Sequence, residues 1–545
     1  MKEGIIKFLN YCHYIFFIFF LLLGIYIFKD FGFNIDESFH RRSGFYWLNY
    51  LSEFFNLETL SNISNEKFLN ANDFTMPWGT YDKSYGLIFD VPAAFLEIIL
   101  NLEDPIKYYE MRHLLVFLYF FLGIIFFYKL LINRFDNKFI ALFGCIILAT
   151  TPRLFGDSFH NNKDIIFLSI FIITSYSYFK LIDSDKLKYL IVFSILSALA
   201  TSTRLFGMIF PLIFLFVYFL SVLSNKKELK KINKLFIYIF LYLIFLFLHW
   251  PYLWVDPINK FFSLLNNLDS FGPAIVYFND TFYNSNLLPY HYLPLWILIS
   301  TPVVNILLFL FGFYLISKIF ISKLLYIEKI KSKYDFWDSS NQKKDFIIYL
   351  IFIIFIILGI FFASKHYNSW RIFYFLNFFF VYFACYFLKN FSKKKYLKIF
   401  VILLIFTTSF NFYRLFIYHP YQSLYFNVLA LKSFKNKFEV DFTGLSGVKF
   451  LRNVTQNDKR DEIKIGINSW YPLWRMKELL SEEAKNRIVI VHENNEEVDY
   501  VYSNRIYNVN MKLSNKFTLS KNFKIHKQYI VDNVIIYDVF KNMKK

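Results

Sequence analysis

The sequence predicts a mostly α-helical, polytopic membrane bundle of about eleven transmembrane helices, followed by a small extracytoplasmic α/β domain at the C-terminus. Hydrophobic residues make up 56% of the 545 residues, and the mean hydropathy of +0.38 is high for a soluble chain. Long apolar runs recur up to about residue 420, and short strand-like runs follow them. We therefore expect a membrane module over 1–420 and a separate C-terminal domain over 421–545.

Each expected transmembrane helix corresponds to an apolar segment that approaches or reaches the roughly 20 residues needed to cross a bilayer. The third and fifth segments are short for a span. The segments are Ile5–Phe28, His113–Ile132, Phe139–Thr151, Ile165–Phe179, Tyr189–Ser202, Leu205–Leu223, Leu235–Trp250, Leu293–Ile316, Phe346–Phe362, Ile372–Leu388 and Ile399–Phe416.

The distribution of Lys and Arg predicts how these segments are oriented. Alternate connections carry clusters of cations, such as the five Lys of Lys226–Lys234, whereas the connections between them carry only scattered ones. Because short cytoplasmic loops hold most Lys and Arg, we expect a cytoplasmic N-terminus. The loop 29–112, the loop Trp250–Tyr292 and the tail are then extracytoplasmic. We expect a multi-pass protein of the bacterial inner (plasma) membrane with a periplasmic active site.

Charge and cysteine usage exclude several other classes of protein. The net charge of +19 comes from Lys clusters between apolar runs, which predicts contact with the lipid bilayer and no nucleic-acid partner. Cys12, Cys145 and Cys385 lie in or beside apolar runs, so neither a disulfide framework nor a Cys-based metal site is expected. No small-residue cleavage site follows the first apolar run, which predicts an anchor.

The tail after Tyr418 has the pattern of a small α/β domain. Strands are expected at Ile463–Ile467, Arg487–Val491, Val498–Tyr502 and Val534–Val539. An amphipathic helix is expected over Leu473–Lys485.

The first external loop opens with a charged cluster, from Asn34 to Arg42, a few residues after the first span. Asp36 and Glu37 are adjacent carboxylates, and His40 and Arg41 follow them within one helical turn. Charge this close to a bilayer is costly unless it faces water or does chemistry. A solvated helix end would explain the cluster equally well if it stood alone.

Further polar residues fall next to apolar runs on the same predicted side. They occur in the segments 151–164, 201–204, 249–257 and 365–371. The Trp residues there are typical interface anchors, but the acids and cations are not explained in this way. The candidate catalytic residues are Asp36, Glu37 and Asp164. The candidate substrate-binding residues are His40, Arg41, His160, Asn162, Lys163, Arg204, Lys365, His366 and Arg371.

Acids and cations at one membrane depth suit a transfer from a lipid-linked phosphate. A phosphate leaving group needs cations that stabilise its developing negative charge. An acceptor hydroxyl needs a carboxylate within hydrogen-bonding reach to take its proton. Both substrates would meet where a phosphate embedded in lipid reaches water.

These features resemble the GT-C superfamily of glycosyltransferases that use polyprenyl-phosphate sugars. The chain is most similar to the branch of protein O-mannosyltransferases and the aminoarabinose transferase of lipid A (glycosyltransferase family 39-like). The resemblance rests on Asp36-Glu37, on the segment Pro152–Asp164, and on the Trp- and Pro-rich loop after the seventh segment, and it extends over about 420 residues.

The resemblance implies that Asp36 is the catalytic base, that Asp164 is a second acid and that transfer inverts the anomeric carbon. Its donor would be a polyprenyl-phosphate sugar, and its acceptor a glycolipid, polysaccharide or protein. No cofactor is assigned, and the involvement of a divalent cation stays open. The β-trefoil module of eukaryotic protein mannosyltransferases is missing, which weakens the case for a protein acceptor.

Two other classes of function remain open on the sequence. A secondary transporter or lipid flippase would carry ionisable residues near mid-membrane and two related halves, but here the charges gather near the segment ends and no repeat is visible. In a non-catalytic membrane assembly protein, Asp36, Asp164 and Arg204 would be ordinary loop charges.

The predicted orientation can be tested by cysteine accessibility labelling. Single cysteines introduced into the loop 29–112, the loop Trp250–Tyr292 and the tail should react with a membrane-impermeant reagent added from outside. A site in the loop Lys226–Lys234 is the control and should be protected. Labelling of the tail only from the cytoplasmic side would mean that the number of spans is even.

Overall fold

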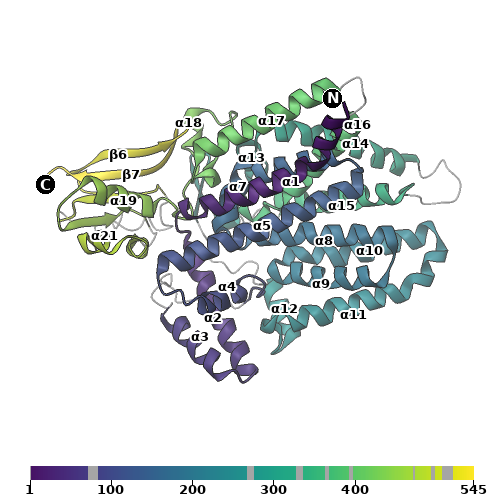
Figure 1. Cartoon of the computed structure of the whole chain (residues 1–545), viewed down its shortest axis with the longest axis horizontal. Helices are drawn as coiled ribbons and strands as arrows, with labels where there is room; N and C mark the ends of the chain where they lie inside the picture. The colour runs from purple at the N-terminus through teal and green to yellow at the C-terminus, as the bar shows by residue number, and fades with distance from the viewer. Residues whose placement is uncertain are drawn as a thin grey trace.

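The computed structural model of the chain is mostly helical and describes residues 2–70, 84–266, 275–326, 336–361, 368–391, 397–469, 473–491, 497–505 and 519–544. Long helices lie side by side along the horizontal axis of Figure 1. The helices α2, α3 and α4 and the C-terminal strands lie toward one end of this bundle, which we call the site end. The N-terminus lies away from it.

Seven helical stretches among the described residues are long and apolar enough to cross a membrane, or eight if one bent pair counts as a span. The chain is therefore an integral membrane protein. Each of the eleven predicted segments contains a helix, but the number of eleven crossings stays a prediction. The seven stretches are built on α1 (Lys2–Ile27), α5 (Pro105–Phe135), α8 (Asp164–Ser184), α10 (Ile209–Ser224), α11 (Ile232–Leu248), α14 (Val303–Tyr326) and α15 (Ser340–Phe361).

Of the other apolar helices among the described residues, all but one of 22 residues have 17 residues or fewer. The helices α6 (Lys138–Thr150) and α7 (Pro152–His160) meet at an angle of 66°, because proline at position 152 cannot continue the hydrogen-bond pattern of α6. A second break, at Thr301-Pro302, separates α13 (Tyr292–Ser300) from α14. The other three apolar helices are α9 (Leu187–Thr203), α16 (Leu376–Phe391) and α17 (Leu397–Tyr418).

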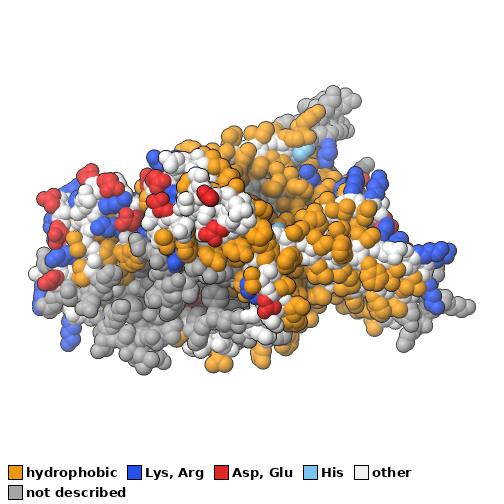
Figure 2. Space-filling model, turned by 90° about the horizontal axis from the view of Figure 1, so that it is seen from below, with side chains coloured by type: hydrophobic (Ala, Val, Ile, Leu, Met, Phe, Trp, Pro, Cys, Tyr) orange, Lys and Arg blue, Asp and Glu red, His pale blue; other side chains and the backbone are white. Residues whose placement is uncertain are grey.

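The surface of the bundle fits a lipid environment. Figure 2 shows hydrophobic side chains over the helices and Lys and Arg gathered at the end opposite the site end. Large apolar residues such as Phe236 and Phe240 of α11 are each 63% exposed. Such exposure would be costly in water and is ordinary in a bilayer.

A layer of short helices covers part of the site end. The helices α2 (Ile35–Phe54), α3 (Glu58–Asn70) and α4 (Asp90–Ile99) pack together, with both α3 and α4 against α2. The inner face of α4 buries Ala93 and Glu97. Farther along the chain, α12 (Pro257–Asn266) precedes a hairpin of β1 (Ile275–Phe278) and β2 (Thr281–Asn284).

A five-stranded mixed sheet forms after α17, in the order β4-β3-β5-β7-β6. The first three pair in parallel, whereas β7 is antiparallel to both neighbours. The four predicted strands all form, and β6 was missed. The strands are β3 (Ile463–Ile467), β4 (Ile488–Val491), β5 (Tyr500–Ser503), β6 (Phe523–Val531) and β7 (Val534–Asn542).

The helices of this region differ from the prediction. The helix expected over Leu473–Lys485 is divided into α20 (Leu473–Lys477) and α21 (Glu482–Arg487). The two helices are separate because Ser481 lies between them and its hydroxyl caps the N-terminus of α21. Two further helices, α18 (Lys432–Lys435) and α19 (Gly447–Asn457), precede the sheet.

The C-terminal region packs directly onto the bundle. Asp532, in the β6–β7 turn, accepts hydrogen bonds from Arg414 and Tyr418 at the end of α17 (3.1 and 2.8 Å) and from Lys435 (2.9 Å). Gly156 of α7 permits close contact with the chain just after α17, because a Cβ there would lie 2.5 Å from the backbone nitrogen of Ser423. The segment that leads to the sheet thus passes along α7.

One buried carboxyl of this region gives a testable pH dependence. Asp441 accepts hydrogen bonds from the backbone N–H (3.2 Å) and the hydroxyl (2.6 Å) of Ser446. Burial raises the pKa of Asp441 to about 6, although these hydrogen bonds oppose the shift. Below that pH the folded chain holds a proton that the unfolded chain has released, so the contribution of Asp441 to stability falls as the pH rises from roughly 4 to 6.

We predict that Asp441→Asn, which keeps a hydrogen-bond acceptor without a charge, removes this dependence. The free energy of unfolding of wild type should fall relative to that of the variant by on the order of 2–3 kcal/mol as the pH rises from roughly 4 to 7. Thermal unfolding of detergent-solubilised protein at both pH values measures the difference. A stability difference that does not change with pH would contradict the prediction.

Candidate functional site

The first turn of α2 brings Asp36 against Arg371, which lies 335 residues later in the chain. The Arg371 Nη1 donates to Asp36 Oδ2 at 2.5 Å. The Arg371 side chain is 8% exposed and that of Asp36 is 35% exposed. The predicted base and one of the predicted phosphate-binding cations therefore form an ion pair that solvent reaches from the Asp36 side.

A capping box fixes where α2 begins. The side chain of Asn34 accepts a hydrogen bond from the backbone N–H of Asp36 (2.9 Å), and the carboxylate of Glu37 accepts one from the backbone N–H of Asn34 (3.0 Å). These contacts satisfy donors that a helix start leaves open. Glu37 is buried and also contacts the ring of His113 in α5 at 3.0 Å. Glu37 thus holds the helix start, while Asp36 beside it reaches Arg371.

The same Asn34 links α2 to the end of α7. Its Nδ2 lies 3.1 Å from Nδ1 of His160 and donates to the His160 carbonyl oxygen at 3.3 Å. His160, a predicted binding residue, is buried. The break between α6 and α7 therefore directs the end of α7 toward the start of α2.

A second acid–cation pair forms at the start of α8. Asp164 contacts Arg204, which follows α9. The side chain of Asn161 donates to Asp164 (3.0 Å) and to Asp157 (3.2 Å), and its oxygen accepts the backbone N–H of Asp164 (3.0 Å). Asp164 and Arg204, predicted independently, are thus direct partners.

A histidine–carboxylate contact joins two more predicted residues. The His40 Nδ1 lies 3.1 Å from Asp90 Oδ2, and Asn162 Nδ2 donates to Asp90 Oδ1 at 3.2 Å. Asp90 begins α4, so this contact connects α2, α4 and the α7–α8 turn. Lys163, the next residue, directs its ammonium onto the ring of Tyr85.

Arg41 faces a different set of partners. Its guanidinium makes two-pronged hydrogen bonds to Glu97 (2.7 and 3.1 Å) and stacks on the ring of Tyr108 at 3.9 Å. Arg112 also donates to Glu97 at 3.3 Å. The structure therefore places Arg41 in a buried ion cluster that joins α2, α4 and α5, while Lys365 and His366 lie outside the described residues.

Several polar residues of the site were not singled out from the sequence. Asp157 lies in the segment 151–164 named above, and Asp90 is a charged residue within the apolar run 87–100 of the first external loop. His113 stood at the first position of a predicted span. Nothing in the sequence pointed to Glu439, which contacts the turn before Arg371.

The charges around Asp36 keep it ionised. Burial raises the pKa of Asp36, but the charge of Arg371 and its hydrogen bond lower the pKa by more, and His40 and Lys163 add to the lowering. The net pKa lies below the usual value for Asp. At neutral pH the carboxylate is therefore available as a proton acceptor.

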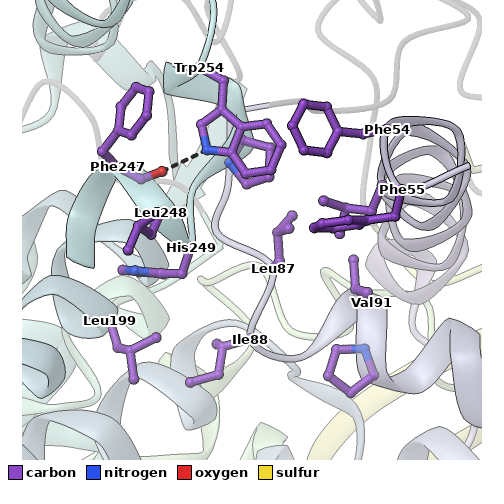
Figure 3. Close-up of a pocket in the computed structure, with 13 residues that line it drawn as sticks. Phe54, Phe55, Leu87, Ile88, Val91, Leu199, Phe247, Leu248, His249 and Trp254 are labelled. Carbon is purple, nitrogen blue, oxygen red and sulfur yellow. Dashed lines mark hydrogen bonds between the residues drawn. The ribbon is translucent and has the colours of Figure 1, made fainter. Parts of the chain in front are cut away.

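An apolar groove of about 720 Å³ lies beside these polar groups. Figure 3 shows Phe54, the last residue of α2, and the following Phe55 on one side of it and Leu199, Leu248 and Trp254 on the other. Its floor includes Leu87, Ile88 and Val91. Because Val91 directly follows Asp90, one short segment lines the groove and also bears a carboxylate of the polar cluster.

A metal centre of several side chains is not formed within the part of the chain that the structure describes. There, His, Cys, Asp and Glu side chains do not gather in groups of three or more that could hold an ion. Asp157 and Asp164 both accept a hydrogen bond from Asn161, but they do not form a group of three with another described His, Cys, Asp or Glu side chain. A role for a divalent cation thus stays open.

Comparison with protein families gives one match. Residues 93–254 match the family described as dolichyl-phosphate-mannose-protein mannosyltransferase. The predicted resemblance to the protein O-mannosyltransferase branch is therefore confirmed on this segment, which contains His160, Asp164 and Arg204 but not Asp36 or Arg371. A search of curated proteins finds no match.

Solved structures with a similar course of the chain include proteins of two organisms. ArnT from Cupriavidus metallidurans bound to undecaprenyl phosphate is 9% identical, with 97% of this chain and 98% of that chain covered and a TM-score of 0.45. The apo oligosaccharyltransferase of Archaeoglobus fulgidus is 12% identical, with coverage of 91% and 70% and a TM-score of 0.44.

The buried cluster around Glu97 gives a stability prediction. Glu97→Gln would leave Arg41 and Arg112 without a counter-charge in a buried position, which typically costs about 3–5 kcal/mol. The matched control is Glu103→Gln, because Glu103 is 73% exposed and pairs with Lys67 at the surface. It should change stability by no more than about 0.5 kcal/mol.

Thermal unfolding of the purified variants in detergent provides the measurement. Equal stability of Glu97→Gln and wild type would show that the cluster does not hold the layer of short helices in place.

Proposed function

We propose that this chain is an integral-membrane glycosyltransferase that moves a sugar from a polyprenyl-phosphate donor to an acceptor hydroxyl. Asp36 acts as the general base, and the transfer inverts the anomeric carbon. The observation that carries the proposal is the ion pair of Asp36 with Arg371, which joins a proton acceptor to a phosphate-binding cation. The family match over residues 93–254 supports the same reaction class.

The ion pair suggests how donor binding prepares the base. A donor phosphate that binds Arg371 replaces Asp36 as the partner of the guanidinium, because Arg binds phosphate through two parallel hydrogen bonds. The pKa of Asp36, which Arg371 now lowers, then rises toward its ordinary value. Asp36 is released and becomes a stronger base only when the donor is present.

The reaction is a single displacement at the anomeric carbon. The acceptor oxygen forms a bond to this carbon as the bond to the phosphate oxygen breaks, and the bonding electrons pass to the phosphate. The proton of the acceptor hydroxyl passes to Asp36. Arg371 stabilises the negative charge that develops on the phosphate, in a site where low dielectric strengthens the interaction. One displacement inverts the configuration.

The second pair has a supporting role in this proposal. Asp164 orients the acceptor or a bound ion, and Arg204 is a second cation for the donor phosphate. Lys365 and His366 are further candidates for phosphate binding that rest on the sequence alone. Glu37 shapes the site through the start of α2.

The apolar groove fits the lipid part of such a donor. Its wall consists of side chains such as Phe55, Leu199 and Trp254, and an isoprenoid chain is a hydrocarbon without polar groups. The segment from Tyr85 to Val91 connects this groove to His40 through Asp90. A chain in the groove would thus bring its phosphate toward the polar cluster.

The setting and acceptor are further parts of the proposal. The Lys clusters away from the site end favour a periplasmic site at a bacterial inner membrane. The acceptor would be a hydroxyl of a glycolipid, a polysaccharide or a protein. The sugar is a hexose or a related monosaccharide.

The decisive variant is Asp36→Asn, which keeps the size of the side chain and removes the base. Transfer of radiolabelled sugar from the lipid donor to acceptor in membranes should fall by about 10²–10⁴-fold. Glu37→Gln should cost less, and Asp164→Asn should fall between the two. Binding of the donor should survive in Asp36→Asn, because Arg371 stays in place. Full activity of Asp36→Asn at normal protein levels would refute the assignment.

A further inference from the structure

The turn that delivers Arg371 to Asp36 has a strained backbone. Asn368 and Ser369 are both left-handed, with φ of 55° and 60°. This conformation is accessible to Asn but is disfavoured for a residue such as Ser, whose Cβ crowds the backbone there. Surrounding contacts must therefore hold the turn in place.

A carboxylate from the C-terminal region supplies one of these contacts. The Glu439 Oε1 accepts a hydrogen bond from the backbone N–H of Ser369 at 3.2 Å, and both residues are buried. The backbone N–H of Asn368 also interacts with this carboxylate. Successive N–H groups in such a turn form a concave donor site that suits an anion.

The position of Glu439 is itself fixed. Its backbone N–H donates to the carbonyl oxygen of Tyr277 in β1 at 3.0 Å, and the backbone of Phe438 bridges to that of Phe278. The segment around Glu439 therefore lies along the β1–β2 hairpin. A carboxylate anchored in this way can fix the turn that it binds.

Two other elements hold the remaining polar atoms of Ser369. Arg153 of α7 donates from Nη1 to the Ser369 hydroxyl (3.2 Å), and the hydroxyl of Tyr292 in α13 donates to the Ser369 carbonyl oxygen (3.2 Å). Arg371 follows two residues later. A small movement of Ser369 would therefore also move the guanidinium of Arg371.

We propose that Glu439 is a positioning residue for donor binding, which holds the Asn368–Ser369 turn so that Arg371 meets the donor phosphate. The C-terminal region thereby takes part in donor binding. The inference rests on the proposed function, since it assumes that Arg371 binds the phosphate.

The chemistry of Glu439 supports this role over simple turn stabilisation. Burial raises the pKa of Glu439 to about 7, although the amides of the turn and the charge of Arg371 oppose the shift. A buried carboxylate is thus costly here, and an amide side chain would accept the same hydrogen bonds at lower cost. The carboxylate also lies near enough to Arg371 to favour its positive charge.

The test is a double-mutant cycle between Glu439 and Arg371, read as the dissociation constant of a polyprenyl phosphate. Wild type, Glu439→Ala, Arg371→Ala and the double variant are compared in phosphatidylcholine nanodiscs, with unfolding temperatures recorded for each. We expect each single change to weaken binding about tenfold. Glu439→Ala should add less than about twofold in the Arg371→Ala background, because it acts through Arg371.

Glu439→Gln keeps the acceptor oxygen but loses the negative charge near Arg371, so it should weaken binding by up to about threefold, less than Glu439→Ala. Glu439→Asp keeps the charge but withdraws the oxygen by about one methylene, so it should weaken binding; it replaces the Ala variant if that variant does not fold. Asp532→Asn is the control for general loosening of the C-terminal region, because Asp532 binds Arg414, Tyr418 and Lys435 rather than the Asn368–Ser369 turn. It should lower the unfolding temperature without changing the dissociation constant.

The outcomes separate this inference from the proposed function. Fully additive effects of the two Ala changes, or unchanged binding in Glu439→Ala and Glu439→Asp, would overturn the role of Glu439 alone. Weaker binding in Asp532→Asn that matches Glu439→Ala would also overturn it. Unchanged binding in Arg371→Ala would overturn both the role of Glu439 and the donor site on which it rests.

Discussion

Every structural feature near the site depends on one constraint, which is that a buried charge must meet an opposite charge. Arg371 begins a single 3-10 turn and Arg204 directly follows α9, and each finds a carboxylate from another part of the chain. Taking a charge out of water costs several kcal/mol, and the attraction of an oppositely charged partner must offset that cost. The ion pairs therefore fix which helix ends lie together, and Glu97 does the same for the short helices.

Both site carboxylates lie in the first turn of a helix, Asp36 in α2 and Asp164 in α8. The backbone N–H groups of a first turn stabilise negative charge, so the two helices favour ionised side chains at these positions. The capping box around Asn34 adds a rigid start to α2. A carboxylate that is ionised, held by its backbone and partly open to solvent can exchange its cationic partner for another group without refolding of the site.

Much of this architecture follows from local pattern, which explains what the sequence predicted well. The length of the apolar runs predicts the helices, and the alternation of apolar and polar residues predicts the strands β3, β4, β5 and β7. The strand β6 was missed because its residues from Lys524 to Gln528 are mainly polar and solvent-exposed, so the pattern there shows no buried face. The region Leu473–Lys485 was predicted as one helix instead of two because the capping serine inside it was not recognised.

The candidate site was predicted as a set of residue types and only partly as a set of contacts. Asp36, Asp164, Arg204 and Arg371 were recognised because charge beside a span is unusual. Their pairing depends on how the helices pack, and no local signal specifies that. Arg41 is the clearest example. It lies in the same charged segment of the sequence as Asp36, but its side chain pairs with Glu97. Glu439 could not be found from sequence because it acts through the backbone of a turn.

The short helix α9 has a consequence for the bilayer itself. Its 17 residues span about 25 Å, less than the roughly 30 Å of a hydrocarbon core, and its Leu199 lines the apolar groove. If α9 crosses the membrane, as the sequence predicts, the bilayer beside it would thin to match its length. At this flank the headgroup region would then lie closer to the helix ends. A lipid-linked phosphate that diffuses along the membrane would therefore approach the polar cluster without leaving its own depth in the leaflet.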